Sequence, residues 1–268
     1  MVNIMTEKEL LAIIEETVAY VDQNEREVPT LPEIPFDKPY NRYCDHSVLR
    51  SYTKKEIIKE FCEEAIRYNA ASVCVTPCNI PYVVECLKGT NVLAGAAIGF
   101  PLGNTTTAVK AFEAAEAVKN GAGECDMVIN VGRLRDGDYL YVYEDILAVR
   151  KAVGENFCLK VITENCYLNR YQKIAACAIA KAAGANWVKT STGMGTGGAT
   201  LEDIALMRRA VKDELPVKAA SGVDSRALAD AFIGVGAQRL GISRLIAICT
   251  GEDNADCASK HNKVPDPN

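Results

Sequence analysis

The feature that most constrains the fold is an alternation of short β-rich runs and helical patterns along the 268-residue chain. The runs begin about every 28 residues, the length of one strand–helix unit. There are eight such runs: Tyr43–Ser47, Ser72–Thr76, Val92–Ile98, Cys125–Asn130, Cys158–Thr163, Asn186–Thr190, Leu215–Ala219 and Gln238–Ile242. We therefore predict an α/β chain folded as a closed (β/α)8 barrel, also called a TIM barrel, rather than a doubly wound sheet, which usually has about six strands.

Three segments of the chain differ in character. Residues 1–40 hold an amphipathic helix, roughly Glu7–Val21, and then Val28–Pro39, where four prolines exclude regular structure and suggest an arm. Residues 41–248 form the barrel. Residues 249–268 are a polar tail, which we expect to pack loosely.

Several helix boundaries are marked in the sequence. Thr53-x-x-Glu56 and Thr200-x-x-Asp203 fit a capping box or a close variant, so both predict a helix start. Ala108–Lys119 is rich in Ala, Glu and Lys and predicts a helix that ends at Asn120.

Composition narrows the classes of partner and of chemistry. A formal net charge of −5 offers no basic surface for nucleic acid or an anionic membrane, so a small molecule is the expected partner. With only two histidines, His46 and His261, a three-histidine zinc site is excluded, and we expect no metal. Eleven cysteines without a Cys-x-x-Cys motif indicate reduced thiols in a cytoplasmic protein. For Cys74, buried packing is favoured over a reactive thiol.

A Gly-x-Gly-x-x-Gly string spans Gly193–Gly198. Dinucleotide binding is a weak interpretation, because that fingerprint opens a Rossmann domain, whereas here it follows five strand–helix units. We interpret the string as a flexible loop that faces phosphate or substrate.

The predicted strands have one aliphatic and one polar face, because side chains alternate along a strand. A lysine on a strand is often an edge-strand residue, but a closed barrel has no edges. Burying the lysines and carboxylates of the polar face would cost several kcal/mol unless their charges pair, so we predict a charge network and a site inside the barrel. The three lysines and three carboxylates on this face are Lys160, Lys189, Lys218, Asp45, Asp126 and Glu164.

Lys189 is the sharpest candidate for catalysis. Desolvation and a nearby positive charge from Lys218 both disfavour a charged ammonium, and an uncharged lysine is a nucleophile for a carbonyl carbon. Asp126 or Glu164 would then transfer the protons that the condensation requires.

A phosphate site is expected at the ends of strands seven and eight, its usual place in this fold. Those ends contain Ser221-Gly222-Val223 and Gly241-Ile-Ser-Arg244. Backbone N–H groups, two hydroxyls and the Arg244 guanidinium would cradle an anion. The alternative, held equally, is that Ser221-Gly222 is only a tight turn and Arg244 a surface residue.

Seven separate motifs together resemble the deoxyribose-phosphate aldolases, a family of class I aldolases that form a Schiff base and have a (β/α)8 fold. The resemblance covers about residues 43–248. The motifs are Asp45–Ser47, Ala71–Val75, Ile98–Gly103, Gly121–Asn130, Lys160–Glu164, Val188–Gly193 and Val217–Gly222.

The resemblance implies an aldehyde-lyase that reversibly cleaves 2-deoxy-D-ribose 5-phosphate to D-glyceraldehyde 3-phosphate and acetaldehyde, with no cofactor. It implies that Lys189 forms the Schiff base, that Lys218 is its charged neighbour and relays protons, and that Asp126 donates and accepts protons. Contacts with the substrate or its phosphate are expected from Asp45, Lys160, Glu164, Thr192, Gly193, Ser221, Gly222, Ser243 and Arg244.

The sequence departs from the family pattern at Thr76 and, around the expected phosphate site, at Ser221, Asp224 and Arg244. Two alternatives stay open: another lysine-dependent aldolase or transaldolase acting on a different sugar phosphate, and a non-catalytic descendant that binds sugar phosphates. We further expect a homodimer or higher homo-oligomer.

Overall fold

Eight parallel strands form a closed barrel in which each strand pairs with its neighbours in chain order and β8 pairs with β1. The computed structural model describes residues 5–25, 38–212 and 214–264. Its barrel confirms the predicted (β/α)8 class and the eight predicted strands, with bounds shifted by one or two residues. The strands are β1 Cys44–Ser47, β2 Ser72–Val75, β3 Leu93–Ile98, β4 Glu124–Val128, β5 Cys158–Ile162, β6 Trp187–Lys189, β7 Val217–Ala220 and β8 Ala237–Ile242.

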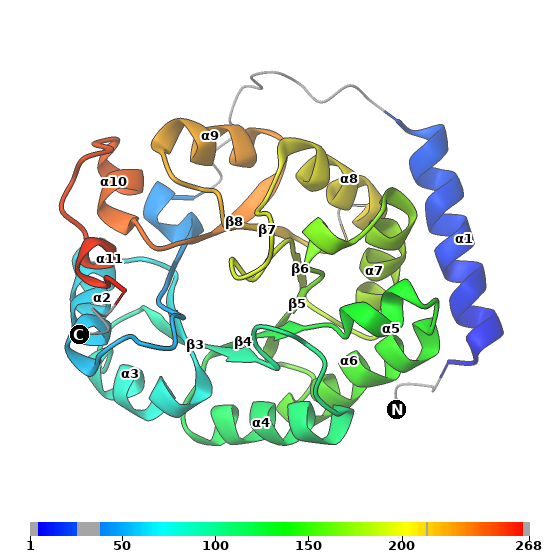
Figure 1. Cartoon of the computed structure of the whole chain (residues 1–268), viewed down its shortest axis with the longest axis horizontal. Coiled ribbons are helices and arrows are strands. Elements are labelled where there is room, and N and C mark those ends of the chain that lie inside the picture. Colours follow the sequence, from blue (N-terminus) through cyan, green and yellow to red (C-terminus); the bar gives the residue numbers. More distant parts are fainter. Residues whose placement is uncertain (1–4, 26–37, 213, 265–268) are drawn as a thin grey trace.

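Helices surround the barrel as a ring (Figure 1). Short 3-10 turns precede β1 and follow β2 and β5: η1 Tyr40–Tyr43, η2 Pro77–Asn79 and η3 Asn165–Tyr167. The helices that follow the strands are α2 Lys55–Arg67, α3 Ile80–Cys86, α4 Thr107–Lys119, α5 Val131–Arg135, α6 Tyr139–Val153, α7 Arg170–Ala182, α8 Leu201–Val211, α9 Arg226–Gly234 and α10 Leu245–Thr250. None of the described helices is long and apolar enough to cross a membrane.

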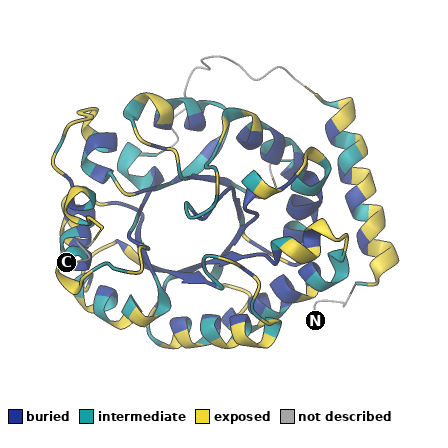
Figure 2. Cartoon of the chain, viewed as in Figure 1, coloured by how far each residue is buried: buried dark blue, intermediate teal, exposed yellow. Residues whose placement is uncertain are grey.

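The strands are buried on both faces, as parallel barrel strands must be. Figure 2 shows the ring of strands almost wholly buried, with exposed residues on the outer sides of the helices. The aliphatic residues predicted to face the helices, such as Val73, Val161 and Val217, are fully buried in the hydrophobic core. This leaves the opposite face of each strand for the interior of the barrel.

One of the two predicted helix caps is confirmed. Thr200 caps α8, because its side chain accepts a hydrogen bond from the backbone N–H of Asp203. The prediction for Thr53 is wrong: the N-cap of α2 is Lys54, one residue later, and no side chain caps it. The Thr53 hydroxyl instead accepts a hydrogen bond from the Asn262 side-chain amide at 3.0 Å.

The N-terminal helix lies outside the ring. Helix α1, Glu7–Gln23, extends the predicted helix by two residues and begins with a capping box at Thr6. Its buried residues Leu10, Ile14 and Val21 recur at helical spacing, and the helix packs mainly against α7 and α8. Residues 28–37 of the predicted proline-rich arm lie outside the described residues.

The C-terminal segment is better packed than its composition suggests. Cys257 and Ala258 are buried, and a short helix, α11 Ala258–His261, packs against α2. The backbone N–H of Ala258 donates to the Glu64 carboxylate, whose other oxygen lies 2.8 Å from His46 Nε2. The expectation of a loose tail is therefore wrong for the part of it that the structure describes.

Candidate active site

Three lysines converge on one carboxylate inside the barrel. Lys189 Nζ and Lys218 Nζ donate to the same oxygen of Asp126, Oδ2, at 2.8 Å and 2.7 Å. Lys160 Nζ donates to the other oxygen, Oδ1, at 2.9 Å. All four side chains are at most 3% exposed, so the predicted charge network exists and is shielded from solvent.

Strand register brings these residues together. Asp126 of β4 is the register partner of Lys160 on β5, and Lys189 of β6 is the partner of Lys218 on β7. The Lys218 side chain passes Gly241 of β8, where a Cβ atom would lie 3.2 Å from Lys218 Cε. The same Cβ atom would lie 2.9 Å from Ala220 Cβ, so the close approach of β7 to β8 explains the glycine.

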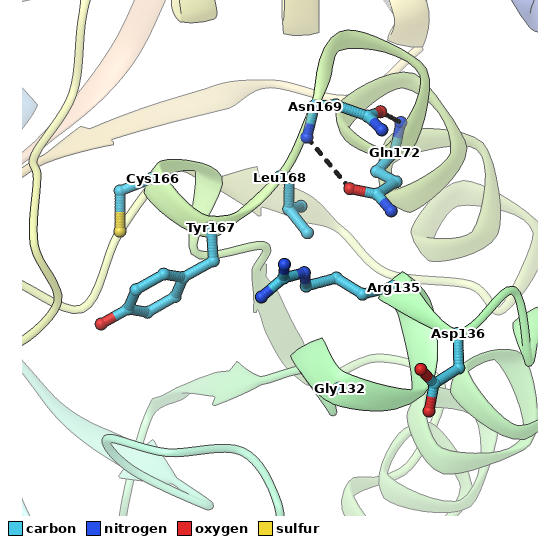
Figure 3. Close-up of a pocket in the computed structure, with 8 residues that line it drawn as sticks. All are labelled: Gly132, Arg135, Asp136, Cys166, Tyr167, Leu168, Asn169 and Gln172. Carbon is cyan, nitrogen blue, oxygen red and sulfur yellow. Dashed lines mark hydrogen bonds between the residues drawn. The ribbon is translucent and has the colours of Figure 1, made fainter.

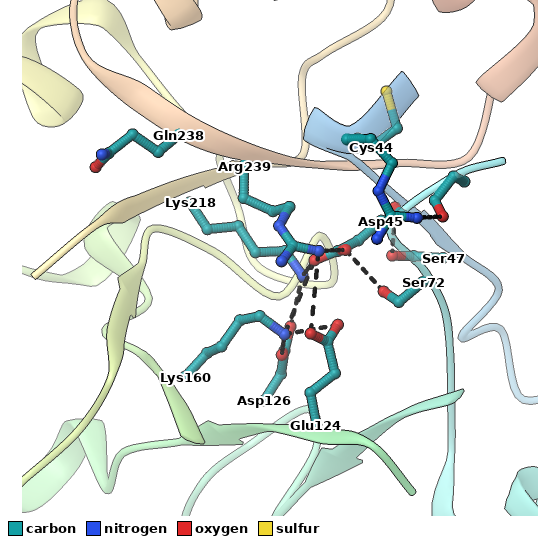
Figure 4. Close-up of polar contacts among 12 residues, drawn as sticks. Cys44, Asp45, Ser47, Ser72, Glu124, Asp126, Lys160, Lys218, Gln238 and Arg239 are labelled. Atoms are coloured by element: carbon teal, nitrogen blue, oxygen red, sulfur yellow. Dashed lines mark hydrogen bonds and ion pairs between the residues drawn. The ribbon is translucent and has the colours of Figure 1, made fainter. Parts of the chain in front are cut away.

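A second carboxylate balances the cluster from the other side. Asp45 lies 2.6 Å from Lys218 Nζ through Oδ2, and its Oδ1 accepts hydrogen bonds from Arg239 at 2.6 Å and Ser72 at 2.7 Å. Glu124 lies 2.7 Å from Lys160 Nζ. Figure 4 shows the side chains of Lys160, Lys218 and Arg239 reaching this one group of carboxylates.

Glu124 and Arg239 were not singled out from the sequence, although a signal was present. Glu124 lies two residues before Asp126, and Arg239 lies two residues before Gly241, so each shares the inward face of its strand. The predicted start of β4 at residue 125 excluded Glu124.

The cluster favours the ionised form of Asp126 and the protonated form of Lys218. Burial raises the pKa of Asp126, but Lys160, Lys189 and Lys218 outweigh burial and hold that pKa well below its usual value. Burial lowers the pKa of Lys218, yet Asp126 and Asp45 outweigh it and raise that pKa above its usual value. Burial also raises the pKa of the Cys74 thiol to about 11, which agrees with a packing role for that residue.

Glu164 was predicted to belong to the lysine cluster, but it lies outside that cluster. It follows β5 in a left-handed conformation with φ 52°. One carboxylate oxygen, Oε1, accepts from the backbone N–H of Thr192 at 3.1 Å, and the other from the Thr192 hydroxyl at 2.5 Å. Glu164 therefore fixes the loop after Lys189.

A pocket of about 370 Å³ opens above the cluster. It is lined by the segments after β1, β6, β7 and β8 and by Ser259 and Asn262 of the C-terminal segment. Of the three clustered lysines, Lys189 is the one that lines this pocket, while Lys160, Lys218 and Asp45 lie beneath it and are completely buried. A carbonyl compound in the pocket would therefore meet Lys189 first.

Most of the expected phosphate residues line the same pocket. Thr192, Gly193, Ser221, Gly222 and Ser243 are among its lining residues. Ser221 has φ 67°, a left-handed conformation that glycine adopts more easily than serine.

Arg244 is not at this pocket, contrary to the prediction. Its guanidinium donates to the backbone carbonyl of Asp224 at 2.7 Å and to that of Asp253. These bonds tie the loop after β7 to the C-terminal segment. The equally held alternative, a residue without a phosphate role, fits this geometry better.

The glycine string after β6 has both a packing and a lining role. A Cβ atom at Gly198 would lie 2.6 Å from the Ser221 carbonyl oxygen, so the two loops touch only because this residue is glycine. Gly193 and Met194 line the pocket. The predicted contact with substrate therefore concerns the start of the string, and its end serves loop packing.

A larger cleft of about 630 Å³ lies beside α5 and the start of α7. Figure 3 shows the Arg135 side chain pointing into it near Tyr167 and Leu168, and Asp136 pointing away. No lysine is among its described lining residues, so we place the candidate active site at the smaller pocket that contains Lys189.

Comparison with known proteins identifies the family. Residues 42–250 match the model of the DeoC/LacD family aldolases, which covers the whole barrel. The chain belongs to this aldolase family. As a member, it is an aldehyde-lyase, an enzyme that cleaves carbon–carbon bonds.

Two similar proteins share the name deoxyribose-phosphate aldolase. A protein of Clostridium perfringens (strain 13 / Type A) named deoxyribose-phosphate aldolase is 51% identical over 211 residues, which are 79% of this chain and 94% of that protein. One of Thermococcus gammatolerans with the same name is 50% identical over 218 residues, covering 80% and 97%. The family model matches this chain from residue 42, which comes after α1, so α1 lies outside the shared barrel.

Solved structures agree with the fold of this aldolase. A Coccidioides immitis protein assigned to the deoxyribose-phosphate aldolases superposes with a TM-score of 0.85 at 33% identity, covering 92% of this chain and 97% of that one. The deoxyribose phosphate aldolase of Aeropyrum pernix, described as tetrameric, superposes with a TM-score of 0.74 at 23% identity, covering 93% and 99%.

The cluster predicts how stability depends on pH. Lys218, Arg239 and Lys160 together outweigh burial and hold the pKa of Asp45 below its ordinary value of 3.8, so its ionised form stabilises the fold above that pH and this contribution is lost as pH falls further. At pH 7, Asp45→Asn should lower the free energy of unfolding by about 3–5 kcal/mol, because buried cations lose their partner. Urea unfolding at pH 7 and near pH 2.5 measures both effects.

The difference in free energy of unfolding between the wild type and Asp45→Asn should be smaller at the lower pH. Asp136→Asn, on the exposed end of α5, is the matched control and should change stability little at either pH. A difference of the same size at both pH values would contradict the assigned charge state of Asp45.

Proposed function

We propose that this aldolase cleaves 2-deoxy-D-ribose 5-phosphate to D-glyceraldehyde 3-phosphate and acetaldehyde through a Schiff base on Lys189. The observation that carries the proposal is the sharing of Asp126 Oδ2 by Lys189 and Lys218, with Lys189 alone of the clustered lysines lining the pocket. Relatives about half identical over 94–97% of their own length carry the name of this activity, which supports the same substrate here.

The Schiff base forms in two proton transfers that this geometry serves. Asp126 Oδ2 takes a proton from Lys189 Nζ, and the free amine attacks the C1 aldehyde of the open-chain sugar to give a carbinolamine. Asp126 returns that proton to the carbinolamine hydroxyl, which leaves as water and gives an iminium. Lys218, bonded to the same oxygen, relays the proton by giving up one N–H proton and taking one back. The positive charge that Lys189 carried at the start is thereby kept on the iminium nitrogen.

Carbon–carbon cleavage then uses the iminium as an electron sink. The C3 hydroxyl gives its proton to Asp126, the C2–C3 bond breaks, and the electron pair of that bond moves through C1 to the nitrogen to form an enamine. The C3 fragment departs as glyceraldehyde 3-phosphate. Asp126 returns that proton to the enamine at C2, and addition of water to the resulting iminium releases acetaldehyde and restores Lys189.

The remaining predicted site residues divide into two roles in this proposal. Thr192, Gly193, Ser221, Gly222 and Ser243 contact the substrate from the pocket wall. The buried residues Asp45 and Lys160 position the catalytic group from below, and Glu164 positions Thr192. None of these steps calls on a metal or an organic cofactor.

Two further expectations belong to the proposal. The chain works in the cytoplasm, which is supported by its eleven cysteines, all of them free thiols. It also assembles as a homodimer or higher homo-oligomer. Support comes from the tetrameric Aeropyrum pernix aldolase and from the exposed apolar side chains of Leu102, Val109 and Phe112.

Lys189→Arg should abolish turnover while the protein stays folded, because arginine keeps the positive charge but cannot deprotonate to attack a carbonyl. Sodium borohydride added with acetaldehyde should leave one ethyl group on Lys189 of the wild type, located by mass spectrometry of peptides. Lys59→Arg, at an exposed lysine of α2, is the control and should keep full activity. An adduct on another lysine would refute the assignment.

Lys218→Leu should reduce kcat by about 10²–10⁴-fold, because the reaction loses the group that passes a proton to Asp126 Oδ2. Release of glyceraldehyde 3-phosphate, followed with a coupled enzyme assay, measures the loss. Lys218→Arg, which keeps the charge between Asp126 and Asp45, separates the proton-transfer role from folding and should also be slow. Full activity of both variants would show that Lys218 takes no part in the reaction.

Sedimentation equilibrium should give a mass at least twice the 29.0 kDa of one chain, because a monomer would leave the apolar side chains of α4 exposed to water. A single 29.0 kDa species at micromolar concentration would contradict the expected homo-oligomer.

A further inference from the structure

The pocket that contains Lys189 carries very little positive charge for a phosphorylated substrate. Three charged side chains are among its described lining residues: Lys189, Arg50 and Asp224. Lys189 is held by Asp126 beneath the pocket and must become the imine at the aldehyde end of the sugar. Asp224 is a carboxylate and would repel a phosphate. A phosphate at the other end of the substrate therefore has one cation available, Arg50.

We propose that Arg50 binds the phosphate of the substrate and sets the preference for phosphorylated over unphosphorylated sugars. This inference rests on the proposed function, and it moves to Arg50 the role that the sequence suggested for Arg244. The two arginines differ in what already occupies them. The Arg244 guanidinium is bonded to the backbone carbonyls of Asp224 and Asp253 and does not line the pocket, whereas Arg50 is exposed at the pocket wall.

The Arg50 guanidinium has only a weak partner within the described part of the chain. Its Nη1 lies 3.1 Å from the Met194 sulfur, and no described carboxylate pairs with it. A thioether sulfur is a weak acceptor, so a phosphate oxygen would replace it at little cost. Arginine also offers two parallel N–H groups that match two phosphate oxygens, which makes the pairing directional as well as electrostatic.

The backbone around Arg50 is fixed on both sides, which places its side chain over the pocket. Val48 continues the barrel ladder by donating its N–H to the Cys74 carbonyl at 2.9 Å. The Arg50 carbonyl accepts from the Thr53 N–H at 3.1 Å and closes a turn. The C-terminal segment holds that turn through the bond from Asn262 to Thr53.

Met194, whose sulfur contacts the Arg50 guanidinium, is held in place as well. The Met194 N–H donates to the Thr192 hydroxyl at 3.0 Å, and Thr192 is held by Glu164. Arg50 and Met194 therefore come from the loops after β1 and β6, on either side of a pocket whose volume of about 370 Å³ suits a small sugar phosphate.

The test compares two substrates in the full-length enzyme. Arg50→Gln should lower kcat/KM for 2-deoxyribose 5-phosphate by about 10–100-fold, mainly through KM, because charge-assisted hydrogen bonds to phosphate are lost. kcat/KM for unphosphorylated 2-deoxyribose should change less than about twofold, since that sugar makes no such bonds. Arg50→Lys keeps the charge but loses the paired N–H groups, so its kcat/KM for 2-deoxyribose 5-phosphate should lie between the values of the wild type and of Arg50→Gln.

Arg135→Gln is the matched control, because Arg135 is an exposed arginine of the neighbouring cleft and the substitution makes the same change of charge. It should leave kcat/KM unchanged for both substrates. An equal loss of kcat/KM for both substrates in Arg50→Gln, or no loss for either, would overturn the proposal.

Binding of inorganic phosphate, measured by isothermal titration calorimetry, separates this proposal from the proposed function. The wild type and Arg135→Gln should bind phosphate with equal affinity, and Arg50→Gln should bind it at least about tenfold more weakly. If the wild type cleaves neither sugar, the proposed function fails, while the loss of phosphate binding in Arg50→Gln still supports the role of Arg50. Equal phosphate binding in all three proteins would refute that role.

Discussion

The site depends on one buried carboxylate, Asp126, which three lysine ammonium groups share. Three positive charges inside a barrel repel one another and lose their hydration, so they are tolerated only where carboxylates lie within hydrogen-bond reach. Asp126 meets this requirement with its two oxygens, and Asp45 and Glu124 complete the balance. The same arrangement that makes the interior stable leaves one lysine at the pocket and a proton-accepting oxygen beside it.

Much of this arrangement was predictable, because a strand and a barrel impose simple rules. The alternation of side chains placed Asp126, Lys160, Lys189 and Lys218 on the inward faces, and barrel closure brought the faces together. Glu164 was assigned to the same network, since it has the same parity as Lys160. It leaves the network because the chain turns into a left-handed conformation after β5, and strand parity no longer applies there.

The loops were harder to predict for a physical reason. Hydrogen bonds between segments far apart in the chain decide where a loop side chain points, and sequence spacing does not encode them. Arg244 lies at the end of β8, where phosphate groups usually bind in this fold, yet two backbone carbonyls occupy its guanidinium. The C-terminal segment looked loosely packed, but it reaches the pocket because Glu64 and Thr53 of distant elements hold it.

By itself, the sequence determined the barrel, its inward-facing charges and the lysine chemistry, because these follow from strand periodicity and from the shortage of histidines. Only the tertiary structure decided that Lys160 and Lys218 lie beneath the pocket, which oxygen links Lys189 to Lys218, and which arginine lines the pocket. Those outcomes depend on strand register and on loop contacts to within a few tenths of an ångström, because hydrogen bonds weaken steeply with small changes in distance and angle.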